Sequence, residues 1–136
     1  MNRKSIKAIE KILISILELD IITKGRDDNY FYDGYEMPVI CDLVHDIEIS
    51  INNISKKIIS KYDYINWKVI ESRKENDNGF MVLKLGKTWE LADGIIKKEL
   101  YEKLLNILEI ELPVYYTNYC NNKHKQFVKG NTKEDN

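Results

Sequence analysis

The sequence predicts a mainly α-helical fold, a helical bundle of one domain, and two observations support this class. Apolar residues recur at spacings of three and four in three separate stretches, which is the pattern of amphipathic helices. Each of these helices has one apolar stripe, so the helices can bury their stripes only against one another. The length of 136 residues suits one domain with its own core.

The first helix is predicted from about Lys4 to Thr23, ended by Lys24 and Gly25. Its apolar stripe comprises Ile6, Ile9, Leu13, Ile16 and Leu17. The segment that follows, residues 26–35, combines turn-forming polar residues with tyrosines and a phenylalanine. This composition predicts a loop anchored by aromatic side chains.

The second helix is predicted to begin near Pro38, because proline fits the first turn of a helix. Its apolar residues step by threes and fours into about residue 61. They are Ile40, Leu43, Val44, Ile47, Ile51, Ile54 and Ile58. We expect one continuous helix over this range.

Residues 62–94 combine sequence features of helix, turn and strand. A short aromatic connector, residues 62–65, precedes an expected helix with Trp67 and Ile70 on its inner side, which ends near Arg73. Turn formers occupy residues 76–79. Residues 80–85 and 88–91 then predict a short β-hairpin insertion, within residues 80–92, although Gly86 could equally cap a helical turn.

The last helix is expected to follow Asp93 and Gly94, which resemble an N-cap region, and to stop near Pro113. Its stripe comprises Ile95, Ile96, Leu100, Leu104, Ile107 and Leu108. Residues 121–136 are polar and predict a disordered tail. The folded domain is therefore expected to span residues 1–120.

Composition argues against several classes of protein. The 21 Lys and Arg nearly balance the 22 Asp and Glu, whereas a dedicated DNA-binding domain is usually more basic. Charges interrupt the apolar residues near the N-terminus, which argues against a signal peptide or a membrane span. Cys41 and Cys120 are far apart and suit a reducing cytoplasm. Abundant Ile, Asn and Lys with scarce Arg are typical of AT-rich bacterial or phage genomes.

The segment from Ile65 to Phe80 resembles a ribonuclease motif of HepT-like toxins, small helical proteins of the HEPN superfamily. In that family an arginine and an asparagine, three variable residues, a histidine, one residue and a tyrosine form the site, usually assembled across a homodimer. Arg73 matches the arginine, whereas Lys74, Asn78 and Phe80 replace the asparagine, histidine and tyrosine.

These replacements imply a degenerate HEPN-like protein that binds and does not cleave. The amide of Asn78 cannot act as an acid or base near neutral pH, as a histidine would. Phe80 has no hydroxyl to accept the nucleotidyl group that a partner antitoxin transfers to the tyrosine. The resemblance thus implies a homodimer that engages a protein partner in a toxin–antitoxin, defence or anti-defence system, for example as a nuclease inhibitor.

Aromatic and basic side chains near the motif are the candidate binding residues. They are Tyr30, Tyr32, Tyr35, Tyr62, Tyr64, Trp67, Lys68 and Arg73. Rings and positive charges together can bind nucleic acid, but Asp63, Glu71 and Glu75 offset the charge, so a protein interface is favoured. The structural alternative is that Arg73 is a solvated arginine and Trp67 a core anchor.

Two other functions stay open. One is a HEPN ribonuclease in which Arg73 works with His45 or His124 as the base. The other is a structural or small-ligand-sequestering protein, which would have a large enclosed pocket. Asp42, His45 and Asp46 lie within about one helical turn, but no second histidine or cysteine joins them, so we expect no metal site and no cofactor.

Overall fold

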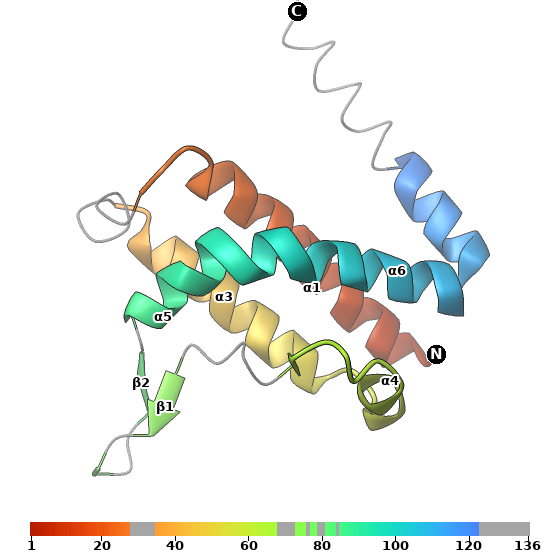
Figure 1. The fold of residues 1–136 in the computed structure, drawn as a ribbon, viewed down its shortest axis with the longest axis horizontal. Helices are drawn as coiled ribbons and strands as arrows, with labels where there is room; N and C mark the ends of the chain where they lie inside the picture. Colours follow the sequence, from red (N-terminus) through yellow and green to blue (C-terminus); the bar gives the residue numbers. More distant parts are fainter. Residues whose placement is uncertain (28–34, 68–72, 76, 79–80, 84, 123–136) are drawn as a thin grey trace, which may run out of the picture. The chain divides into compact units, whose positions relative to one another are not determined.

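A computed structural model of the protein describes residues 1–27, 35–67, 73–75, 77–78, 81–83 and 85–122. These residues are mainly α-helical, as predicted (Figure 1). The chain divides into two compact units, Met1–Lys103 and Leu104–Asn136. No helix in the described part of the chain is long and apolar enough to cross a membrane.

Helix α1 (Arg3–Thr23) begins and ends close to its predicted limits. The side chain of Asn2 caps its start by accepting a hydrogen bond from the Ser5 backbone N–H at 2.8 Å. The helix ends at Lys24, followed by Gly25 with a φ of 70°. Because a positive φ is strained for residues with a Cβ, glycine suits this position.

The predicted second helix is two helices, α3 (Met37–Asn52) and α4 (Lys56–Lys61). All seven residues of the predicted stripe are buried, but the prediction of one continuous helix is wrong. Ser55 has an extended backbone, and its side chain caps α4 by accepting from the Ile58 N–H at 3.4 Å. Its own N–H donates to the Ser5 hydroxyl oxygen at 2.9 Å. The chain therefore breaks where α1 supplies a hydrogen-bond acceptor.

The β-hairpin lies earlier in the chain than predicted. Strands β1 (Arg73–Glu75) and β2 (Met81–Leu83) pair antiparallel, with Lys74 opposite Val82. The first predicted strand, residues 80–85, contains β2, whereas the second, residues 88–91, is wrong because helix starts at Leu85. Arg73 is in a strand and not at the end of a helix.

One helical stretch runs from α5 (Leu85–Glu90) through the π-helical segment η2 (Leu91–Leu100) into α6 (Tyr101–Glu111). Residues 93 and 94 therefore lie within a helix and do not cap its start, which corrects the prediction. A π-helix aligns residues five apart. This spacing lets Leu91 and Ile96 both be fully buried.

The core of the Met1–Lys103 unit lies where α1 packs against α3 and η2, with α5 contacting α3 and η2 as well. Its fully buried large side chains include Ile9, Ile12, Leu13, Leu19, Ile40, Ile47, Leu91 and Ile96. Of the predicted first stripe, Ile9, Leu13 and Ile16 are buried, and Ile6 and Leu17 are half-buried. The amphipathic pattern thus identified the packed faces.

In the second unit, Leu104, Ile107 and Leu108 of α6 are fully buried. The predicted stop near Pro113 is a break at Leu112, after which residues 113–122 are helical again. Residues 121 and 122 continue this helix. The rest of the predicted tail, residues 123–136, lies outside the described residues.

Candidate binding site

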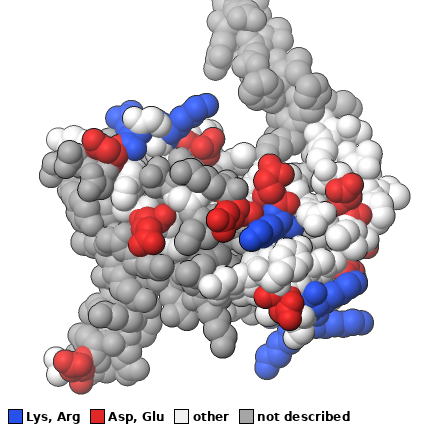
Figure 2. Space-filling view, viewed as in Figure 1, with Lys and Arg blue, Asp and Glu red and all other residues white. Residues whose placement is uncertain are grey.

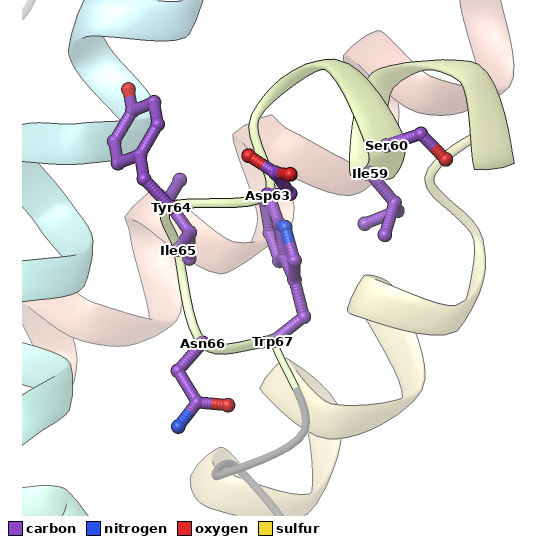
Figure 3. A pocket seen from close by; sticks show the side chains of 7 residues that line it. All are labelled: Ile59, Ser60, Asp63, Tyr64, Ile65, Asn66 and Trp67. Atoms are coloured by element: carbon purple, nitrogen blue, oxygen red, sulfur yellow. The ribbon is translucent and has the colours of Figure 1, made fainter.

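A pocket of about 430 Å³ lies at the turn that follows α4. Its lining combines α4 with the turn, and Figure 3 shows these side chains: Ile59, Ser60, Asp63, Tyr64, Ile65, Asn66 and Trp67. The pocket is open to solvent, since four of these residues are exposed. A small-ligand-sequestering protein would instead enclose its ligand.

Hydrogen bonds hold the turn in one conformation. The indole Nε1–H of Trp67 donates to the backbone carbonyl of Tyr62 at 3.1 Å, across the turn. The backbone N–H of Ile65 donates to the same carbonyl at 3.2 Å. The Tyr62 N–H in turn donates to the carbonyl of Ile58 in α4 at 3.0 Å. The turn is thereby fixed to the helix and presents its side chains in a defined arrangement.

The aromatic residues of the turn have different roles. Tyr62 is 4% exposed, so its ring is part of the core and offers no face to a partner. The ring of Tyr64 meets it edge-to-face, with centroids 6.2 Å apart and planes at 74°. Tyr64 itself is 55% exposed and points away from the other side chains of the pocket (Figure 3). The half-buried Trp67 and the exposed Tyr64 are thus the rings that a partner can contact.

Sequence reasoning missed five pocket residues, namely Ile59, Ser60, Asp63, Ile65 and Asn66. A helical signal existed for three of them, because Ile59 and Ser60 precede Asp63 by four and three positions. At this spacing side chains share one face of a helix, and that face continues into the turn. The pocket therefore combines apolar surface with a carboxylate, a hydroxyl and an amide. These groups can bind a partner through apolar contacts and hydrogen bonds.

Among the other predicted binding residues, Tyr62 and Tyr35 do not line this pocket. Tyr35 is 98% exposed just before α3. Tyr30, Tyr32, Lys68 and Phe80 lie outside the described residues.

At the motif positions, Arg73 and Lys74 form β1, and Asn78 is exposed in the turn between the strands. The side chains of Arg73 and Lys74 are not among those described.

His45 lies on α3, where its Nδ1 is 3.6 Å from Oε1 of Glu48. The other histidine, His124, lies outside the described residues. Within the described ranges, Asp42, His45 and Asp46 do not make a group that could hold a metal ion, and no other three His, Cys, Asp or Glu do so.

No protein-family model matches the sequence, and comparisons with curated proteins and with solved structures find no match either.

Proposed function

We propose that this protein acts by binding a protein partner, without ribonuclease activity of its own. The observation that supports the proposal is the pocket after α4, where a hydrogen-bonded turn presents Tyr64 and Trp67 beside apolar surface. Such rings bury large area at little entropic cost, and tyrosine and tryptophan are enriched among the residues that dominate binding energy.

The type of system follows from the resemblance to HEPN proteins, which depends on Arg73 and the replaced residues Lys74, Asn78 and Phe80. A helical protein that keeps the arginine and lacks the histidine is consistent with a degenerate, HEPN-like bundle that binds its partner and does not cleave RNA. We place it in a toxin–antitoxin, defence or anti-defence system, with a nuclease, an antitoxin or a defence component as the partner.

The proposal also includes a homodimer in the cytoplasm. The location follows from Cys41 and Cys120, which are far apart in sequence and suit a reducing compartment. Light scattering during gel filtration measures the oligomer directly, and a mass equal to that of one chain would contradict the dimer.

Photo-crosslinking tests the partner. A photoreactive amino acid replaces Tyr64 in cells that naturally express the protein, and a control protein carries it at Lys24, which is exposed at the end of α1. We expect a discrete protein adduct at position 64 and none at position 24. Identical adducts at both positions, adducts to nucleic acid alone, or no adduct would contradict the proposal.

Incubation with labelled RNA tests the absence of ribonuclease activity. We expect intact RNA, with no difference between the unchanged protein and the Arg73→Ala variant. Cleavage that disappears in Arg73→Ala would instead support a ribonuclease that uses His45 or His124 as its base.

A further inference from the structure

Six exposed basic residues lie in the first turns of α1 and in α4. We call them the basic patch: Arg3, Lys4, Lys7, Lys56, Lys57 and Lys61. The two groups of three are about 50 positions apart in sequence. Residues 1–9 and 49–62, which contain them, have no Asp or Glu.

The fold brings these two segments together. The Ser55 N–H at the start of α4 donates to the Ser5 hydroxyl oxygen in α1 at 2.9 Å. Figure 1 shows α4 beside the N-terminus, and Figure 2, from the same side, shows blue side chains gathered there. The segments that carry the six cations therefore meet at the Ser5–Ser55 hydrogen bond.

The patch stands out against the rest of the chain. Six of the 21 Lys and Arg lie in it, which leaves 15 against 22 Asp and Glu elsewhere. Helix stability does not account for the cations in the first turn of α1. Arg3 and Lys4 occupy the first turn of α1, which has no acidic residue, and cations there oppose the helix dipole.

The patch adjoins the pocket, because α4 carries Lys56, Lys57 and Lys61 and also supplies Ile59 and Ser60 to the pocket lining. An apolar and aromatic centre with charged residues around it is the usual anatomy of a protein interface. Charges at such a rim mainly select the partner and speed its approach.

We propose that the protein partner presents an acidic surface to the basic patch while one of its apolar side chains enters the pocket. This inference rests on the proposed function. A protein is favoured over nucleic acid because Ile59 and Ile65 line the pocket, and such an apolar lining suits an apolar protein side chain.

Fluorescence anisotropy with three labelled probes of matched length tests the chemistry of the partner. The probes are a peptide of alternating glutamate and phenylalanine, the same peptide with glutamine for glutamate, and single-stranded oligouridylate. We expect the acidic peptide to bind about tenfold more tightly than the glutamine peptide at low ionic strength. Equal binding of both peptides, or tighter binding of oligouridylate, would overturn the inference.

Two matched variants locate the effect. Lys57→Glu reverses one charge in the patch, and Lys24→Glu reverses one exposed charge at the other end of α1. We expect Lys57→Glu to weaken binding of the acidic peptide about five- to tenfold and Lys24→Glu to leave it within about twofold. Equal losses in both variants would show that the patch has no special part.

The crosslinking experiment separates failure of this inference from failure of the proposed function. With the photoreactive residue at position 64, adduct formation that survives Lys57→Glu and is abolished by Trp67→Ala would overturn the acidic partner and retain the pocket. Loss of the adduct in Lys57→Glu but not in Lys24→Glu supports both the acidic partner and the proposed function. The absence of an adduct in every variant would contradict the proposed function itself.

Discussion

The hydroxyl of Ser5 is fully buried, and it links parts of the chain that are 50 residues apart. Its oxygen accepts the backbone N–H of Ser55 at 2.9 Å. A buried donor that loses its acceptor costs more than the hydrogen bond contributes. Ser5 therefore fixes the start of α4, and through α4 the basic patch and the pocket.

We predict that Ser5→Ala lowers the free energy of unfolding by about 1–3 kcal/mol, because the Ser55 N–H loses its partner. Ser60→Ala is the control, since Ser60 is exposed on α4, and it should change the free energy by less than about 0.5 kcal/mol. Urea denaturation measures both. Equal effects of the two changes would show that the Ser5 bond adds nothing.

Two glycines differ in backbone conformation, so replacing each with alanine should change the stability of the protein in opposite directions. Gly25 has a φ of 70°, whereas Gly94 lies within η2 and has open space around the position of an added Cβ. Gly25→Ala should destabilise by about 1 kcal/mol, and Gly94→Ala should stabilise by about 0.5–1 kcal/mol. Thermal denaturation followed by circular dichroism distinguishes them, and a shared sign would contradict the argument.

At the scale of elements, the apolar stripe of α3 and α4 shows how far periodicity determines the fold. All seven predicted residues are buried, although the helix breaks between Asn52 and Lys56. Burial depends on the spacing of apolar residues. The break depends on Ser55 and on its acceptor in α1, which periodicity does not detect.

We predict that Ile47→Ala lowers the free energy of unfolding by about 2–5 kcal/mol, through lost burial and a cavity. Ile49→Ala on the same helix is the matched control, because Ile47 is fully buried and Ile49 is 45% exposed. The control should cost less than about 1 kcal/mol. Similar urea midpoints for both variants would mean that this helix face is not packed as described.

The positions of the hairpin and of the last helix were wrong in the sequence prediction for a related reason. Residues 88–91 have a composition that suits a strand, yet the chain is helical from Leu85. Leu91 and Ile96 are both fully buried, and their separation of five residues fits a π-helix. Packing within the core thus prevailed over local propensity.

At the scale of the whole molecule, charged side chains are unevenly distributed, which the net charge does not show. A total of −1 gives no strong field of one sign at long range. At short range the basic patch concentrates positive charge beside the pocket. Because the Debye length is about 8 Å at physiological ionic strength, such a patch acts mainly on a partner that is already close.

We predict that the association rate constant of the acidic peptide falls when salt is added, whereas its dissociation rate constant changes less, since rim charges mainly affect encounter. Stopped-flow fluorescence at low and physiological ionic strength measures both constants. Lys57→Glu should flatten the salt dependence and Lys24→Glu should not. A salt effect confined to dissociation would argue against a steering role for the patch.

The sequence alone determined the helical class, the bounds of α1 and the buried faces of α1, α3 and α4, because these depend on the spacing of apolar side chains along one chain. Two of the predicted binding residues, Tyr64 and Trp67, line the pocket. A third, Tyr62, is buried, because burial depends on neighbours that spacing does not reveal.

The tertiary structure alone decided the break before α4, the pocket and the basic patch. Each arises from groups distant in sequence that meet in space, as the Ser5 hydroxyl meets the Ser55 N–H. Hydrogen bonding and electrostatic forces depend on distance through space, so no pattern along the chain contains them. The sequence thus specified which faces are apolar, and the packing of those faces placed the charges.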